Sequence, residues 1–211
     1  MKKPRLYDIS QRLRPALPVW PGDHAFECGV TAAAGEGSSV TLHRLSMSTQ
    51  SGTHAECSRH VRGDAPALDE LALEIFFGSC QLLDVSAAGA TIVASDVLDR
   101  LPSQFERLLL RSFAKADWAH WPQHFKAIDP VLIDALAARG CRLIGTDAPS
   151  IDPQTCKALR AHQAAHRAGM GILEGLVLDN VPEGRYELVA LPLPISGVEA
   201  TPVRAVLRGL D

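Results

Sequence analysis

The sequence has no excess of basic residues and no long apolar run, and each absence excludes a class of partner. Lysine and arginine number 21 against 24 aspartates and glutamates, so the formal net charge is -3. Without an extended basic surface, nucleic acid and anionic membranes are poor partners. Apolar runs such as "GILEGLVL" contain charges and fall far short of the roughly 20 residues that a membrane-spanning helix needs. We therefore expect a soluble protein that binds a small molecule or another protein.

The sequence also lacks a disulfide pattern. Its five cysteines are an odd number without a C-x-x-C pair, which argues against a disulfide framework and against a zinc ribbon. Cys80 and Cys141 lie in apolar stretches and are expected in the core. The first ten residues, "MKKPRLYDIS", contain no apolar stretch typical of a signal peptide. We expect reduced thiols and a cytoplasmic protein.

Apolar residues, in contrast, are plentiful enough for one proper core, at 46% of 211 residues. Strand-like runs dominate both ends of the chain and helical patterns fall between them, which predicts one mixed α/β domain over residues 1–211. The expected strands lie in "LYDIS", "VTLHRLSMST", "CQLLDV", "ERLLLRS", "CRLIGTD", "GILEGLVL", "YELVALPLPI" and "PVRAVLRGL". The two prolines of "LPLPI" predict an edge or a strand end there.

Capping residues predict three helices. A short helix near 96–101 is expected to follow Ser95 as its N-cap. The stretch "DPVLIDALAARG" has an aspartate cap, a proline at the first helical position and a terminal glycine, which predicts a helix followed by a buried strand. The same order recurs in "DPQTCKALRAHQAAHRAG", which predicts a helix that opens at Pro153, after Asp152, and ends at Gly169.

The segment "QSGTHAECSRH" concentrates groups that can carry chemistry. Gln50, His54, Glu56 and His60 follow one another at spacings of 4, 2 and 4. Because Ser, Gly and Thr are weak helix formers, we expect a tight loop in which these side chains can converge. Imidazole and carboxylate are the usual ligands of zinc and related divalent metals. Spacing alone leaves two interpretations open, a metal site and a polar surface loop.

Two further positions stand out from their surroundings. Glu174 lies inside the apolar run "GMGILEGLVL", where a buried carboxylate needs a charged partner or a metal, unless it points outward from an alternating strand. His162 lies on the predicted helix that precedes it. Trp20 is presented by the turn "PVWPGD", where it is either a hydrophobic plug or an aromatic surface for a ligand.

These residues and their order resemble the bacterial kynurenine formamidases of the cyclase-like metal-dependent hydrolases. The likeness covers nearly the whole chain, through "YDIS", "PVWPGD", "SGTHAE", "GTDAPSIDP", "AHQAAHRAGMGILEGLVLDNVPEGRYELVALPL" and "TPVRAVL". It implies a swivelling β/β/α barrel-like single domain of the cyclase superfamily, assembled as a homodimer.

The resemblance also implies roles for individual residues. His54, His162 and Glu174 match metal ligands of the family, His60 matches its acid/base histidine, and Trp20 matches the aromatic that contacts substrate. Gln50 and Glu56 occupy two further metal positions, where the family has a histidine and an aspartate that bridges two ions. Cys57 and Ser58 stand where Ala-Pro is usual. A glutamine oxygen is a poorer partner for zinc than imidazole, so we expect an altered metal site.

The reaction implied is hydrolysis of N-formyl-L-kynurenine to L-kynurenine and formate, a step of tryptophan catabolism. It requires a divalent metal, expected to be zinc in up to two ions, with manganese as the alternative. Two other hypotheses remain at this point. One is another amide hydrolase of the same superfamily, acting on isatin-like or cyclic amides, and the other is a non-catalytic relative that binds an aromatic metabolite.

Overall fold

A curled nine-stranded sheet forms the centre of the protein in the computed structural model, which describes residues 4–35 and 37–210. The strands are β1 (Leu6–Asp8), β2 (Glu27–Ala32), β3 (Leu42–Ser46), β4 (His54–Glu56), β5 (Phe77–Asp84), β6 (Thr91–Ile92), β7 (Arg107–Arg111), β8 (Ala127–Ile128), β9 (Leu143–Thr146), β10 (Gly171–Glu174), β11 (Gly184–Val189), β12 (Ala200–Pro202) and β13 (Val206–Gly209). The α-helices are α1 (Ala94–Val97), α2 (Pro130–Ala138) and α3 (Arg160–Arg167), and the 3-10 helices are η1 (Ser58–His60), η2 (Leu68–Glu70), η3 (Leu73–Ile75) and η4 (Leu98–Arg100).

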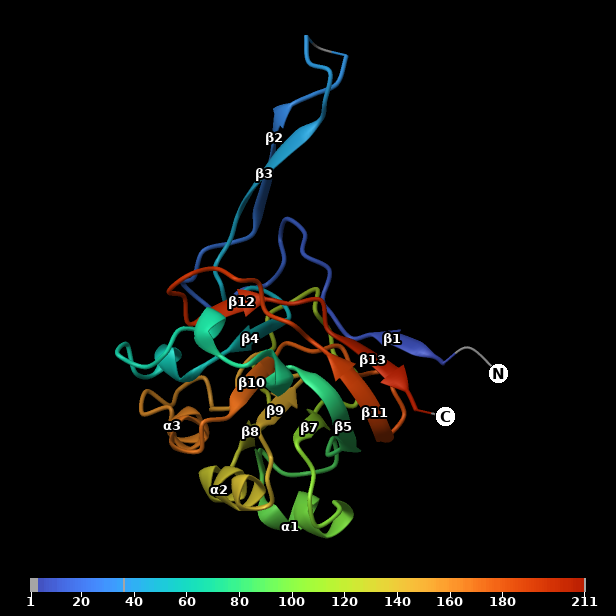
Figure 1. The fold of residues 1–211 in the computed structure, drawn as a ribbon, viewed down its shortest axis with the longest axis vertical. Helices are drawn as coiled ribbons and strands as arrows, with labels where there is room; N and C mark the ends of the chain where they lie inside the picture. Colours follow the sequence, from blue (N-terminus) through green and yellow to red (C-terminus); the bar gives the residue numbers. More distant parts are fainter. Residues whose placement is uncertain (1–3, 36, 211) are drawn as a thin grey trace.

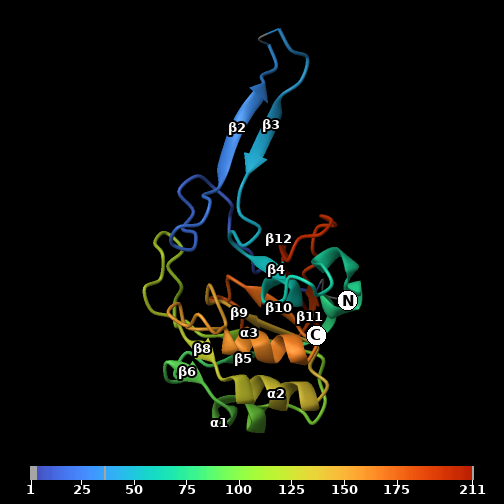
Figure 2. The same ribbon diagram turned by 90° about the vertical axis from the view of Figure 1, so that its left-hand side faces the viewer.

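The sheet is mixed, with the order β1-β13-β11-β5-β7-β9-β10-β4-β12. Neighbours from β5 to β10 are parallel, whereas the pairs on both sides of this block are antiparallel. The three α-helices lie along one side of the sheet (Figures 1 and 2). Strand β10 is therefore the point at which the parallel block meets the antiparallel pair β4 and β12, which carries the central motif.

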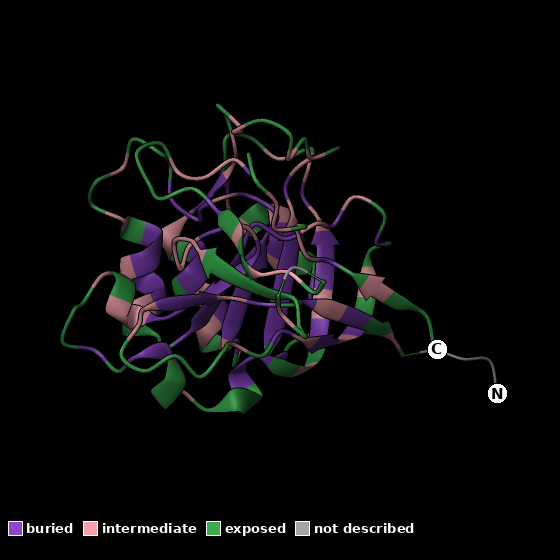
Figure 3. Cartoon of the chain, turned by 90° about the horizontal axis from the view of Figure 1, so that it is seen from above, coloured by how far each residue is buried: buried purple, intermediate pink, exposed green. Residues whose placement is uncertain are grey.

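Alternation along the central strands fills two separate cores. Leu82, Leu109 and Leu173 belong to the cluster on one face of the sheet, and Leu108 and Ile144 belong to the cluster that also contains α2 and α3 side chains. Both faces are covered, which explains why these strands are continuous apolar runs in the sequence. Each fully buried leucine or isoleucine contributes about 1.5–3 kcal/mol. Figure 3 shows the buried central strands and the exposed loops around them.

Helix α2 forms as the sequence predicts. The Asp129 carboxylate accepts a hydrogen bond from the backbone N–H of Val131 (2.9 Å), and Gly140 follows the helix with φ of +89°. Cys80 and Cys141 are buried in the two cores, as expected. The stretch 113–125 is irregular.

The predicted start of the third helix is wrong, because α3 begins at Arg160 and not at Pro153. Asp152 does act as a cap, but its carboxylate accepts bonds from the backbone N–H groups of Ala161 and His162, both at 3.0 Å. The intervening residues 153–159 form turns, and Leu159 has a left-handed φ of 44° immediately before the helix. The tertiary cap at Asp152 replaces the local one that the sequence pattern suggested.

The other differences concern element ends. Ser95 does not cap the short helix, since α1 starts at Ala94 and the Asp96 carboxylate accepts a bond from the N–H of Val93 (2.8 Å). Strand β10 stops at Glu174 because Gly175 adopts φ of +64°, so "GLVL" is not strand. "PVRAVLRGL" divides between β12 and β13, and β11 ends before the prolines of "LPLPI", as their missing N–H groups predict.

Strands β2 and β3 form a separate hairpin that projects from the body as an arm (Figure 1). Its side chains Val30, Leu42 and Leu45 are more than half exposed. A two-stranded ribbon of this kind is marginally stable by itself. Among the helices of residues 4–35 and 37–210, none is long and apolar enough to cross a bilayer.

Candidate active site

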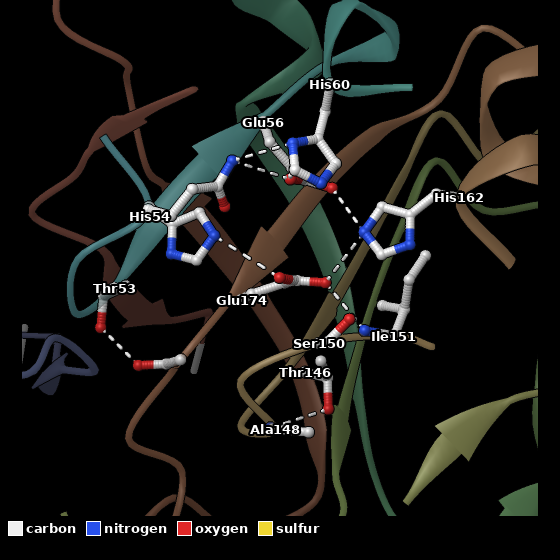
Figure 4. A network of polar contacts seen from close by, with 12 residues as sticks. Thr53, His54, Glu56, His60, Thr146, Ala148, Ser150, Ile151, His162 and Glu174 are labelled. Atoms are coloured by element: carbon white, nitrogen blue, oxygen red, sulfur yellow. Dashed lines mark hydrogen bonds and ion pairs between the residues drawn. The ribbon is translucent and has the colours of Figure 1, made fainter. Parts of the chain in front are cut away.

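Four elements bring the chemistry-bearing side chains to one place. His54 and Glu56 come from β4, His60 ends η1, His162 lies on α3 and Glu174 is the last residue of β10. These five side chains point toward one another (Figure 4). Of the two interpretations that spacing left open for "QSGTHAECSRH", the surface loop is wrong for His54 and Glu56, because both are buried on a strand.

The pairing of β4 with β10 places His54 directly opposite Glu174. Since alternate residues of a strand share a face, Glu56 points the same way as His54, while Ala55 between them faces the core. His54 Nε2 lies 3.5 Å from one Glu174 oxygen. The outward orientation considered for Glu174 is therefore excluded.

Two glycines allow the backbone to approach closely at this point. Gly52 and Gly175 have φ of +67° and +64°, and a Cβ on Gly175 would lie 2.5 Å from the Gly52 carbonyl oxygen. The Thr53 hydroxyl donates to the Gly175 carbonyl (2.6 Å), and the Gly52 carbonyl lies 3.0 Å from His54 Nδ1. Gly52 is thus required by the turn that orients His54.

His162 is fixed from behind by Asp152. Its Nδ1 lies 2.7 Å from one Asp152 oxygen, so the ring nitrogen that faces the site is Nε2. That Nε2 is 2.9 Å from Glu56 Oε1 and 3.5 Å from Glu174 Oε1. The Glu174 oxygen also accepts the backbone N–H of Ile151 (2.8 Å), which fixes its direction.

The ionisable side chains of the cluster shift the pKa values of one another. Burial lowers the pKa of His162, but the Glu56, Asp152 and Glu174 carboxylates outweigh burial and raise it well above its usual value. The pKa of His54 is also raised, since Glu174 and Glu56 overcome the opposing effect of burial. Burial acts to raise the pKa of Glu174, yet its bonds to the two histidines lower it to about 2. The neighbouring carboxylates therefore favour the charged form of both imidazoles.

The donor set fits a divalent metal. Among the described residues, His54 Nε2 and Glu56 Oε1 are buried side-chain atoms that contact Glu174 (3.5 Å) and His162 (2.9 Å) as ion pairs but make no hydrogen bond of good geometry, whereas buried polar atoms in proteins normally do. Two groups of three residues have ligand atoms within 4.8 Å of one another, namely His54, Glu56 and Glu174, and Glu56, His60 and His162. Imidazole and carboxylate at this density are typical of zinc and manganese sites.

Cys57 takes no part in this cluster. It is buried in the core on the β4 side opposite to Glu56, and its thiol donates to the Pro66 carbonyl (3.5 Å). Burial raises the pKa of the thiol, which disfavours the thiolate that would bind a metal. Of the positions at which we expect the sequence to depart from the family, Gln50 lines the cavity described below and Glu56 lies in the cluster, whereas Cys57 does neither.

A cavity of about 340 Å³ opens onto the cluster. Trp20 lines it, as do Trp118 and Trp121 from the irregular stretch 113–125. The rings of Trp20 and Trp121 meet edge to face with centroids 5.5 Å apart. The sequence predicted Trp20 but not the other two tryptophans, whose only signal was aromatic residues without helical or strand periodicity.

Comparison with known proteins identifies the family. The model of the family described as putative cyclase matches residues 7–153, well over half of the chain. The chain belongs to the cyclase family. It is 46% identical over 206 residues to the kynurenine formamidase of Maricaulis maris (strain MCS10), covering 98% of this chain and 99% of that protein. The kynurenine formamidase of Sphingopyxis alaskensis (strain DSM 13593 / LMG 18877 / RB2256) is 44% identical over 204 residues, with coverage of 97% and 98%.

Solved structures of this cyclase family confirm the predicted barrel-like α/β fold. A predicted metal-dependent hydrolase from Bacillus stearothermophilus superposes with a TM-score of 0.84 at 25% identity, covering 97% of this chain and 98% of that one. Isatin hydrolase A from Labrenzia aggregata gives a TM-score of 0.86 at 23% identity, with coverage of 99% and 94%. At that identity the second likeness concerns the fold alone.

Proposed function

We propose that this cyclase-family hydrolase converts N-formyl-L-kynurenine and water to L-kynurenine and formate, in tryptophan catabolism. The observation that carries the proposal is the buried histidine and glutamate cluster at the bottom of a tryptophan-walled cavity. It is supported by the two kynurenine formamidases that match over nearly their full length. Their identity of 44–46% also favours this reaction over an isatin-like substrate and over a non-catalytic relative.

We propose that His54, Glu56, His162 and Glu174 hold a divalent metal, with zinc as the first choice and manganese as the alternative. When bound, such a metal lowers the pKa of a coordinated water to near 7 and polarises a carbonyl oxygen. The protein would supply two imidazole and two carboxylate ligands to this metal. Asp152 would orient one of the imidazoles, that of His162.

His60 is the proposed proton donor to the departing arylamine nitrogen. It is the most exposed of the clustered histidines and lines the cavity, where its ring lies 5.4 Å from that of His162. An imidazole on the cavity wall can donate a proton from a ring nitrogen that the substrate reaches and recover it from water. Trp20 is proposed to stack on the aromatic ring of the substrate, with the formyl group directed to the cluster.

We also propose a cytoplasmic homodimer formed from one domain over residues 1–211. The exposed apolar residues Val30, Leu42 and Leu45 on the hairpin arm support an assembly in which a second copy covers them. All five cysteines are free, in keeping with a reducing compartment. Sedimentation of the purified protein tests the dimer, and a monomer at micromolar concentration would contradict it.

The activity is tested by following kynurenine absorbance after metal is stripped and then restored. We expect no turnover by the stripped protein, and recovery on titration with zinc or manganese. Isatin, assayed beside formylkynurenine, serves as the competing substrate. Binding of the substrate without metal-dependent turnover would favour the non-catalytic alternative and would overturn the proposal.

A further inference from the structure

Gln50 is the position at which the sequence departs from a metal-binding histidine, and its surroundings indicate a different role. Its side-chain nitrogen, Nε2, lies 3.2 Å from Glu56 Oε2, 3.3 Å from His60 Nδ1 and 3.5 Å from Glu199 Oε1. The Glu199 carboxylate is held in place by the Thr49 hydroxyl, which donates to the same oxygen (2.6 Å).

The orientation of the Gln50 amide follows from these neighbours. A carboxylate at neutral pH only accepts hydrogen bonds, so the amide group that faces Glu56 and Glu199 must be the donating NH2. The reverse orientation would place the amide oxygen against two carboxylate oxygens. A nitrogen that donates its protons has no lone pair for a metal, so Gln50 in this orientation is not a ligand through the atom that faces the cluster.

Two of the three atoms that the amide nitrogen faces are atoms that a second ion would need. Glu56 Oε2 and His60 Nδ1 are 3.9 Å apart, and Gln50 Nε2 lies within hydrogen-bond distance of both. The other oxygen of Glu56, Oε1, is buried and faces His162 Nε2 at 2.9 Å. One carboxylate oxygen therefore faces an imidazole with which it could share a metal ion, and the other is engaged by the amide.

We propose that the Gln50 amide takes the place of a second metal ion, so that this chain holds one tightly bound ion within the cluster formed by His54, Glu56, His162 and Glu174. In place of the ligand role expected from the sequence, Gln50 is a positioning residue. It holds the outer oxygen of Glu56, and it donates to His60 Nδ1, which leaves the proton of the neutral ring on Nε2. The inference deepens the proposed function and rests on the metal site proposed there.

Ion counting tests this directly. The protein is loaded with excess zinc, passed through a desalting column and analysed for bound metal by mass spectrometry. The wild type is expected to retain about one ion per chain, and Gln50→Ala to retain no fewer, because the amide is not a ligand. Gln50→His, which offers a lone pair in place of the N–H donors, is expected to retain about one ion more than the wild type.

Kinetics supply the second readout. Loss of the bonds to Glu56 and His60 in Gln50→Ala is expected to lower kcat about 10- to 100-fold and to leave KM within about twofold, as for other residues that orient a metal site. Gln104→Ala, in an exposed loop, is the matched control and should change neither quantity. A kcat for Gln50→Ala equal to that of the wild type would refute the positioning role.

Two ions in the wild type, or fewer ions in Gln50→Ala than in the wild type, would overturn the single-ion inference. The ion count needs no substrate, so it decides the inference even if formylkynurenine is not hydrolysed. Failure of the proposed function would instead appear as absent turnover with one zinc ion bound. Circular dichroism of each variant verifies that it is folded before the ions are counted.

Discussion

The substitution Asp152→Asn examines how one buried carboxylate serves both the fold and the proposed metal site. Asp152 is 2% exposed, and it accepts bonds from the Ala161 N–H (3.0 Å), the His162 N–H (3.0 Å) and His162 Nδ1 (2.7 Å). Asparagine keeps one of the two side-chain oxygens but replaces the other by an NH2 group. This NH2 group is a hydrogen-bond donor and would face N–H groups that are donors as well. At least one backbone donor or the ring then loses its acceptor.

The magnitude follows from these contacts. A hydrogen bond to a charged group is worth about 1.5–3 kcal/mol. Since asparagine preserves part of the set, we expect the free energy of unfolding of the metal-free protein to fall by about 2–4 kcal/mol. For a chain of this length that is a decrease in Tm of roughly 5–15 °C. Zinc affinity should fall about 10- to 100-fold, because the ring that presents Nε2 is no longer fixed.

The pH dependence has a definite sign. Burial acts to raise the pKa of Asp152, but the bonds from His162 and Ala161 outweigh it, so the folded pKa is lower than usual. The stability that this carboxylate contributes is therefore fully present above the unfolded pKa near 3.9 and is lost as the pH falls through the folded value. The Tm difference between wild type and variant should shrink accordingly in acid.

Differential scanning calorimetry and competition with a chromophoric chelator measure the two effects. Asp129→Asn is the matched control, since Asp129 also caps a helix but contacts no histidine, and asparagine is an equally good cap. The control should change zinc affinity by less than about twofold. An unchanged zinc affinity in Asp152→Asn would refute the reasoning that Asp152 orients a metal ligand.

Three further predictions follow from other parts of the structure. His60→Ala should lower turnover of formylkynurenine about 10²- to 10⁴-fold while the bound metal is retained, and loss of the metal would show that His60 is instead a ligand. The hydrogen bond from Arg111 lowers the pKa of Asp84 to about 2, so this pair stabilises the protein above pH 4 and less so as the pH falls toward 2. An acid titration followed by circular dichroism should show a smaller loss in Asp84→Asn than in the wild type. Gly175→Ala places a Cβ 2.5 Å from the Gly52 carbonyl and should destabilise the fold by more than about 2 kcal/mol in urea titration; an unaltered midpoint would contradict the close approach.

The sequence predicted the elements whose causes are local. Helix α2 is correct because its cap, its proline and its terminal glycine all lie within the helix and its flanks. Glu174 could be identified because a carboxylate in an apolar run needs a partner, and the structure supplies His54 and His162.

The elements that were missed depend on distant contacts. Asp152 matches a local helix cap in sequence, but its true partners lie nine and ten residues further on. Glu199 and Trp118 approach the cluster and the cavity from segments that no motif marks. Spacing along the chain carries no information about such neighbours, which become adjacent only through the order of strands in the sheet.

The register between β4 and β10 makes the core and the site depend on one another. The alternation that turns His54 and Glu56 toward the cluster also turns Ala55 and Leu173 into the core. A shift of the strand register by one residue would therefore expose apolar side chains and, at the same time, separate the side chains of the cluster. A change in this strand pairing would therefore affect the core and the site together. Gln50 lies in the turn before β4, outside this constraint. On the single-ion proposal, exchanging this one side chain alters the number of bound metal ions without disturbing the strand register, which makes Gln50 the natural position for redesigning the metal content of the protein.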